Sequence, residues 1–132
     1  MYYIGIDLGG TNIAVGLVTE DGKIVESMSV PTRAERNYTE IVADMAEVSK
    51  KVVEKAGVSM DEVAAVGIGC PGSIDNENGI CTYANNLRME HAEIAKEFKK
   101  HLDLPVNLEN DANAAAYGEY EINGKKYKTG YQ

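Results

Sequence analysis

The sequence predicts an α/β domain with a mixed sheet and helices on both faces. Two observations carry this prediction: three strand patterns follow one another at the N-terminus, and helices then alternate with strands. The predicted order is βββαβαβα. In such an order the first three strands pair antiparallel, and the later βα units extend the sheet and place helices against it.

The three N-terminal strands are predicted over residues 2–8, 13–19 and 23–30. The first strand alternates and then runs apolar, which is typical of a strand that becomes buried. A Gly-Gly turn separates the first strand from the second, and an Asp-Gly turn at residues 20–22 precedes the third. Pro31 closes the third strand.

A helix is predicted between Asn37 and Gly57. Asn37 is a good N-cap residue, and glycine commonly ends a helix because it accepts a left-handed conformation. A further short turn is predicted at residues 59–62. The apolar residues that recur at helical spacing are Ile41, Met45, Val48 and Val52.

The second half of the chain is predicted to continue with strands and helices. The apolar run over residues 63–70 indicates a buried strand, and the Pro- and Gly-containing residues 71–89 indicate a loop. A helix over residues 92–102, a strand over 105–108 and an Ala-rich helix over 110–121 complete the order.

Composition bounds the functions that the chain can have. The 132 residues are enough for one domain, 44% of them are apolar, and the net charge is −8. This acidity argues against a nucleic-acid surface. No apolar run reaches the roughly 18 residues of a membrane span, and no signal peptide is evident, so we expect a cytoplasmic protein without a membrane partner. Cys70 and Cys81 lack metal-ligand spacing and are expected to be reduced structural thiols.

The segment Asp7-Leu-Gly-Gly-Thr11 is the first candidate site. Gly9 and Gly10 can bring bare backbone N–H groups against a phosphate, and Thr11 adds a hydroxyl. Asp7 ends a nearly uncharged strand, where a carboxylate is costly without a partner. It could hold a metal ion directly or through water. The alternative is an ordinary hairpin turn.

Two loop residues in the middle of the chain are further candidates. Gly67 to Gly72 matches the pattern GxGxxG, but a loop rather than a helix follows it, which argues against dinucleotide binding. Gly72 would instead let a ligand approach its backbone, with plain close packing as the alternative. Asn86 offers a donor and an acceptor to a sugar hydroxyl, although asparagine is also common in turns.

The last candidate segment lies where a strand is predicted to end and the final helix to begin. Four of the five residues from Glu109 to Asn113 are polar, which is more than one helix cap needs. Asn110 and Asp111 stand at the junction itself. A carboxylate there could accept a proton from a substrate hydroxyl, and N-capping is the alternative.

Together these segments resemble the ROK family of sugar kinases, and within it the bacterial glucokinases. The resemblance rests on Ile-Asp-Leu-Gly-Gly-Thr, Gly-Ile-Gly-Cys-Pro-Gly-Ser-Ile-Asp, Asn-Asn-Leu and Glu-Asn-Asp-Ala-Asn-Ala-Ala-Ala-Tyr-Gly-Glu, in that order over residues 4–119. It implies the actin-like, RNase H-like ATPase fold. This fold agrees with the predicted βββαβαβα order.

The resemblance implies a sugar side of the site. Asp111 would be the general base that takes the proton of the sugar 6-hydroxyl. Asn86 and Asn110 would bind sugar hydroxyls, and Gly72 would line the site. Arg88 stands where members of the family often have a small residue, so the sugar stays open between glucose, N-acetylmannosamine and fructose.

The resemblance also implies a nucleotide side. Gly9, Gly10 and Thr11 would cradle the phosphates of ATP, and Asp7 would orient Mg²⁺ through its water ligands. The phosphoryl donor could be ATP or polyphosphate. Phosphoryl transfer asks mainly for positioning and charge neutralisation, which these residue types can supply.

Members of the family have a second domain with a zinc site, further sugar ligands and the adenosine pocket, and the motifs of that domain do not occur in this sequence. We therefore expect residues 1–122 to be an N-terminal domain and 123–132 a linker or cut end. Zinc is expected only in the missing second domain, and the parent protein is expected to form a homodimer.

The sequence thus predicts the N-terminal half of an ATP-dependent hexose kinase that phosphorylates the 6-hydroxyl of glucose, inactive on its own. The rival hypothesis is a sugar-sensing ROK regulator. Such regulators carry a DNA-binding domain before these motifs, whereas the first motif here begins at residue 4.

Overall fold

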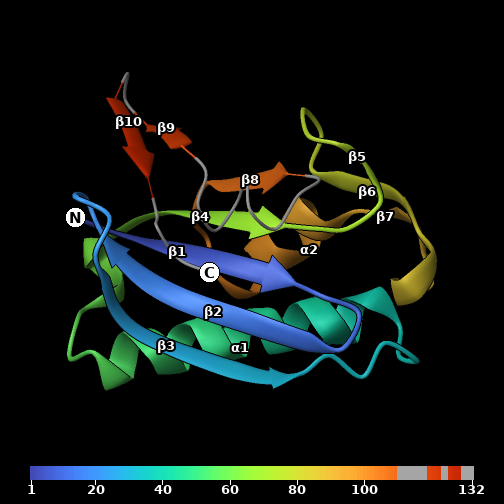
Figure 1. The fold of residues 1–132 in the computed structure, drawn as a ribbon, viewed down its shortest axis with the longest axis horizontal. Helices are drawn as coiled ribbons and strands as arrows, with labels where there is room; N and C mark the ends of the chain where they lie inside the picture. Colours follow the sequence, from blue (N-terminus) through green and yellow to red (C-terminus); the bar gives the residue numbers. More distant parts are fainter. Residues whose placement is uncertain (110–118, 123–124, 129–132) are drawn as a thin grey trace.

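The computed structural model describes residues 1–109, 119–122 and 125–128. Its main sheet has five strands in the order β3-β2-β1-β4-β8 (Figure 1). β1, β2 and β3 pair antiparallel, and β4 and β8 join β1 in parallel, which confirms the predicted mixed sheet. The strands are β1 Tyr2–Leu8, β2 Asn12–Thr19, β3 Ile24–Pro31, β4 Val63–Gly69 and β8 Val106–Glu109.

Two tight turns join the antiparallel strands. In the β1–β2 turn the N–H of Gly9 donates to the carbonyl oxygen of Asn12 at 2.9 Å. In the β2–β3 turn the N–H of Thr19 donates to the carbonyl oxygen of Lys23 at 2.9 Å, and Gly22 has a φ of 87°. Both turns coincide with the glycine signals in the sequence.

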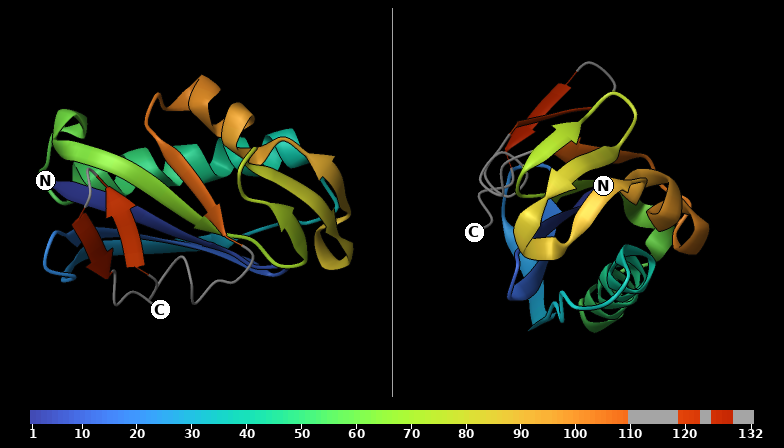
Figure 2. Two further views of the ribbon diagram at one scale, coloured as in Figure 1. Left: turned by 90° about the horizontal axis from the view of Figure 1, so that it is seen from above. Right: turned by 90° about the vertical axis from the view of Figure 1, so that its right-hand side faces the viewer.

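Among the described residues the two α-helices pack on the same face of the main sheet (Figure 2). Helices on its other face stay a prediction. α1 spans Tyr38–Lys55 and α2 spans Ile94–His101. As predicted, the side chain of Asn37 caps α1, accepting from the N–H of Thr39 at 2.9 Å. Gly57, with a φ of 73°, follows the end of α1. A 3₁₀ turn over Met60–Glu62 then leads into β4, close to the short turn that the sequence indicates.

The hydrophobic core lies between this face of the sheet and the two helices. Ile4, Ile6 and Leu8 alternate along β1 and are buried, as the period-2 pattern requires. Phe98 of α2 is the largest fully buried side chain among residues 1–109. Cys70 and Cys81 are free and buried in the same core, as predicted, and the hydrogen bond between their thiols raises the pKa of Cys70 and lowers that of Cys81.

The prediction of a loop over residues 71–89 is wrong. This segment forms most of a second, three-stranded antiparallel sheet, made of β5 Ser73–Asp75, β6 Ile80–Ala84 and β7 Met89–Ala92. The turn between β5 and β6 is held by Asp75, which accepts from both the N–H and the side-chain amide of Asn78. Polar turn residues dominate the segment and obscure its short strands. α2 begins at Ile94 because Ala92 still pairs with Cys81 in this sheet.

The C-terminal helix predicted over residues 110–121 is largely beyond the described part of the chain, which omits residues 110–118. Glu119–Ile122 form strand β9, so the helical prediction is wrong for residues 119–121. β9 pairs antiparallel with β10, Lys125–Lys128, which lies within the segment predicted as a linker. The domain boundary at residue 122 stays a prediction.

Gly79 gives a direct test of how the second sheet is fixed to α2. Its φ is 69°, and a Cβ there would lie 2.3 Å from the Cβ of Ala95. Gly57 has a similar φ of 73° but no heavy atom within 4 Å of such a Cβ. We expect Gly57→Ala to lower the free energy of unfolding by about 1–2 kcal/mol, the cost of the left-handed conformation. Gly79→Ala should cost roughly 1–3 kcal/mol more through overpacking.

Urea denaturation of both variants provides the measurement. Equal losses in the two variants would contradict close packing of the second sheet against α2.

Candidate active site

The candidate site lies at the carboxyl ends of the parallel strands. Asp7 of β1 pairs with Gly69 of β4, and Gly69 pairs with Glu109 of β8. In open α/β sheets ligands bind at this edge, because the loops that follow parallel strands gather there. Figure 1 shows the β1–β2 turn at the same edge as the ends of β4 and β8.

The β1–β2 turn exposes backbone with little side-chain cover. Gly9 and Gly10 are partly exposed and Thr11 is exposed. A Cβ at Gly9 would lie 3.0 Å from the carbonyl oxygen of Asn12, so the tightness of the turn favours glycine there. Exposed N–H groups in a tight turn form a concave surface suited to an anion.

Asn86 lies against this turn. A Cβ at Gly10 would stand 2.9 Å from Nδ2 of Asn86 and 3.4 Å from its Cβ and Cγ. The structure therefore brings together two candidates far apart in the sequence, the glycine turn and the side-chain amide. The contact exists because residue 10 has no side chain.

Gly72 supports the segment that carries Asn86. Its φ is 89°, and a Cβ there would lie 2.2 Å from the carbonyl oxygen of Tyr83. Gly72 therefore permits close packing of the backbone, which is one of the two interpretations that its sequence context allows. Its role in lining a ligand site stays a prediction.

The chain turns sharply on both sides of Asn86. Asn85–Leu87 form a 3₁₀ turn, and the fully buried Leu87 anchors it while Asn86 is exposed. The turn ends at Arg88, which has a left-handed φ of 51°. Non-glycine residues in this region are uncommon and often occur near functional sites.

Asp7 is the acidic group next to the glycine turn. It is half-buried, and this burial raises the pKa of its carboxyl above the usual value. A partly desolvated carboxylate favours a nearby cation. Among the described residues no three His, Cys, Asp or Glu side chains form a metal cluster. The single carboxylate of Asp7 fits Mg²⁺, which keeps several water ligands and is usually bound by one or two carboxylates together with phosphate oxygens.

Asn110 and Asp111 lie outside the described residues, so their roles stay predictions. The structure does place the residue before them. The carbonyl oxygen of Glu109 accepts from the N–H of Cys70 at 2.8 Å, and its side chain accepts from Nδ2 of Asn107 at 3.1 Å. The chain thus leaves β8 at the edge of the sheet where Asp7 lies.

Thr32 is a residue near the site that sequence reasoning missed. It is completely buried, and its hydroxyl and its N–H both bond to the β1–β2 turn. Its only sequence signal is a polar residue directly after the proline that closes β3. That signal does not reveal a contact across the loop.

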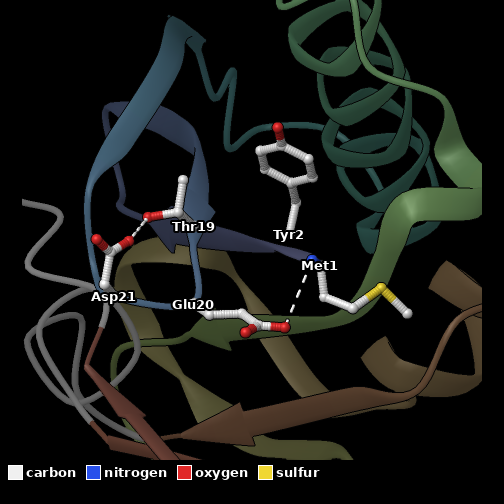
Figure 3. Close-up of a pocket in the computed structure, with 5 residues that line it drawn as sticks. All are labelled: Met1, Tyr2, Thr19, Glu20 and Asp21. Carbon is white, nitrogen blue, oxygen red and sulfur yellow. Dashed lines mark hydrogen bonds and ion pairs between the residues drawn. The ribbon is translucent and has the colours of Figure 1, made fainter.

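A hollow of about 370 Å³ lies elsewhere, at the opposite end of β1 (Figure 3). The N-terminal amine and Glu20 form an exposed ion pair there at 3.4 Å, and the hydroxyl of Thr19 donates to Asp21. Exposed ion pairs of this kind contribute little to the free energy of unfolding. None of the predicted site residues lines this hollow.

The arrangement of strands and the position of the glycine turn define a class of protein: the chain has the actin-like ATPase fold. Residues 3–129 match the ROK family, and the chain belongs to this family. Within the part of the chain that the structure describes, no helix is long and apolar enough to cross a membrane.

The chain is similar to the glucokinase of Thermotoga maritima, at 42% identity over 88% of this chain and 35% of that protein. It is also similar to the structure of a ROK family glucokinase from Streptomyces griseus in complex with glucose and AMPPNP (36% identity, TM-score 0.77). The alignment covers 89% of this chain and 36% of that one. A ROK hexokinase from Thermus thermophilus gives 33% identity and a TM-score of 0.76, over 89% of this chain and 37% of its own.

Other ROK kinases and repressors also match. The chain spans about 35–37% of the length of the glucokinases of Thermotoga maritima and Streptomyces coelicolor.

The raised pKa of Asp7 predicts a conflict between stability and function. Because its folded-state pKa exceeds the unfolded value, Asp7 destabilises the fold above that pKa, and the penalty disappears as pH falls through it. We expect Asp7→Asn to raise the free energy of unfolding at pH 7 and to have little effect at pH 3. Denaturant unfolding at both pH values measures this. A variant that is less stable than the wild type at pH 7 would contradict the desolvation argument.

Proposed function

We propose that the chain is the N-terminal, sugar-site part of an ATP-dependent hexose kinase that transfers the γ-phosphate of ATP to the 6-hydroxyl of glucose. The observation that carries the proposal is the contact between Gly10 and Asn86. Phosphoryl transfer requires donor and acceptor to be held in line and close together. A phosphate-binding turn in contact with a sugar-binding amide meets that requirement.

Each residue has a defined task in this proposal. The backbone N–H groups of Gly10 and Thr11 bind phosphate oxygens, and Asn86 orients the sugar through its amide. Gly9 serves only to keep the turn bare of side chains, because its own N–H is bonded to the carbonyl oxygen of Asn12. Mg²⁺ would neutralise charge on the phosphates, with Asp7 orienting its water ligands. Asp111 accepts the proton of the 6-hydroxyl as that oxygen attacks, while Asn110 binds a neighbouring hydroxyl and Gly72 lines the sugar side.

The relatives support this choice of substrate and donor. The glucokinases named above align with most of the chain, and the Streptomyces griseus glucokinase binds glucose and AMPPNP, an analogue of ATP. The proposal includes a cytoplasmic location and no nucleic-acid or membrane partner. It also includes a second domain, with zinc, and a homodimer for the natural-length protein.

A sugar-sensing regulator is the second candidate, because ROK repressors are among the relatives. The xylose repressor of Caldicellulosiruptor bescii is 29% identical to this chain, against 42% for the Thermotoga maritima glucokinase. Asp7 also favours a kinase, since a sensor that binds only sugar has no use for a desolvated carboxylate beside a phosphate turn.

A spectrophotometric kinase assay tests the proposed function. It uses the natural-length protein, by which we mean the chain together with the proposed second domain. The acceptors are glucose, N-acetylmannosamine, N-acetylglucosamine and fructose, and the donors are ATP and polyphosphate. We expect the highest kcat/KM with glucose and ATP, and no turnover by the 132-residue chain alone, because an open site does not exclude water. Specific DNA binding without sugar phosphorylation would instead support the regulator.

Asp111→Asn separates chemistry from binding. The amide keeps the size of the carboxylate but cannot accept the hydroxyl proton, so kcat should fall by roughly 10²–10⁴-fold, the usual contribution of a general base. The glucose Kd, measured by calorimetry, should change little. A variant that keeps its kcat would show that Asp111 is not the base.

Gly10→Ala tests whether the phosphate turn and Asn86 act together. The added Cβ would stand 2.9 Å from Nδ2 of Asn86, so the amide must move. We expect the KM for glucose to rise about fivefold, which corresponds to one hydrogen bond. In an Asn86→Ala background the same change should affect the KM for glucose much less, because the displaced group is gone. Equal effects in both backgrounds would mean that the two sites are independent.

A further inference from the structure

The buried residue Thr32, which directly follows β3, forms two hydrogen bonds with the β1–β2 turn. The N–H of Thr32 donates to the carbonyl oxygen of Thr11 at 2.8 Å, and its hydroxyl donates to the carbonyl oxygen of Gly9 at 2.7 Å. Thr32 is 0% exposed. Both bonds end on carbonyl oxygens, so neither consumes an N–H group of the turn.

Thr32 is in turn held by an ion pair that reaches helix α1. Nη2 of Arg36 donates to the carbonyl oxygen of Thr32 at 2.7 Å and to Oδ2 of Asp44 at 2.7 Å. The Arg36 side chain is 15% exposed and that of Asp44 33%, so solvent screens this part-buried pair less than a fully exposed salt bridge. The connection therefore runs from α1 through Arg36 and Thr32 to the turn.

A turn with two adjacent glycines needs such support. Glycine loses more conformational freedom on ordering than any other residue. If the turn had to order when phosphate bound, that entropy would be subtracted from the binding free energy. Donors fixed in advance avoid this cost and are more effective as charge develops in the transition state.

We propose that Thr32 is a positioning residue for the phosphate turn, with Arg36 and Asp44 holding it in place. Thr32 fixes the carbonyl groups of the turn and so aims the N–H groups of Gly10 and Thr11 at the phosphates. The role of Thr32 in phosphate binding rests on the proposed kinase function. Its rigidifying of the turn through hydrogen bonds, which we call the fastening of the turn, does not.

Amide hydrogen exchange in the 132-residue chain tests the fastening first. Thr32→Val keeps the size and the backbone N–H but removes the hydroxyl bond to Gly9. The Gly9 amide, which is bonded to Asn12, should then exchange about fivefold faster, while the β1–β2 strand amides stay unchanged. Thr32→Ser restores the hydroxyl and should restore the rate.

Ser49→Ala is the matched control. Ser49 is also 0% exposed and also donates its hydroxyl to a backbone carbonyl, that of Met45, at 2.7 Å. It lies in α1 and has no bond to the turn. Its loss should lower the free energy of unfolding without changing the relative exchange rate at Gly9. An unchanged Gly9 rate in Thr32→Val, or an equal change in Ser49→Ala, would overturn the fastening.

Steady-state kinetics of the natural-length protein test the consequence. Thr32→Val should raise the KM for ATP about fivefold and leave the KM for glucose within twofold, because only the phosphate side is disturbed. Thr32→Ser should behave like the wild type. Arg36→Lys and Asp44→Asn should shift the KM for ATP in the same direction. Equal increases in both KM values, or none, would overturn the positioning role.

A wild type without kinase activity would reject the proposed function and not the positioning of the turn. In that case ATP with Mg²⁺ is titrated against the amide signals of Gly10 and Thr11. Weaker binding by Thr32→Val than by Ser49→Ala would support the positioning role, and equal binding would overturn it.

Discussion

The approach of Asn86 to the backbone of Gly10 is the contact on which the candidate site depends. Gly10 belongs to the β1–β2 turn of the main sheet and Asn86 to the loop between β6 and β7 of the second sheet, so the contact joins the two sheets. Two other glycines fix the second sheet: Gly72 lies against the carbonyl oxygen of Tyr83 and Gly79 against Ala95. Missing side chains at three positions thus bring two segments within reach of one ligand.

The Asp7 carboxylate lowers the stability of the fold but favours the binding of a cation. Burial of Asp7 disfavours its charged form, and within an otherwise apolar β1 this carboxylate weakens the fold. A bound cation would stabilise the charged carboxylate and offset this destabilisation. Because folding has already desolvated part of Asp7, cation binding does not have to supply that part of the desolvation free energy. A charged group at a position that favours a neutral one is a sign of function, since packing alone would be better served by an apolar residue.

The parts that could be predicted from sequence are those that local pattern decides. Alternation defined β1, helical spacing together with Asn37 and Gly57 defined α1, and the Gly-Gly signal located the turn between β1 and β2. The nucleotide-binding role of that turn stays a prediction. The second sheet was missed because its strands are only three to five residues long and lie among turn residues. Thr32 could not be found from sequence because its partner Gly9 is 23 positions away in the chain, and nothing in the local pattern reports such a contact.

A phosphate-binding turn faces two opposing demands. It must be bare, so that phosphate oxygens can reach backbone N–H groups, and it must be rigid, although bare glycine backbone is the least rigid kind. Side chains on the turn itself would supply rigidity by occupying the space that the ligand needs. Under the proposed function, Thr32 avoids this conflict because its two hydrogen bonds go to carbonyl oxygens of the turn and leave the N–H groups of Gly10 and Thr11 to the phosphate. The part-buried Arg36–Asp44 pair extends the same support to α1, so the ordering of the turn is coupled to helix α1.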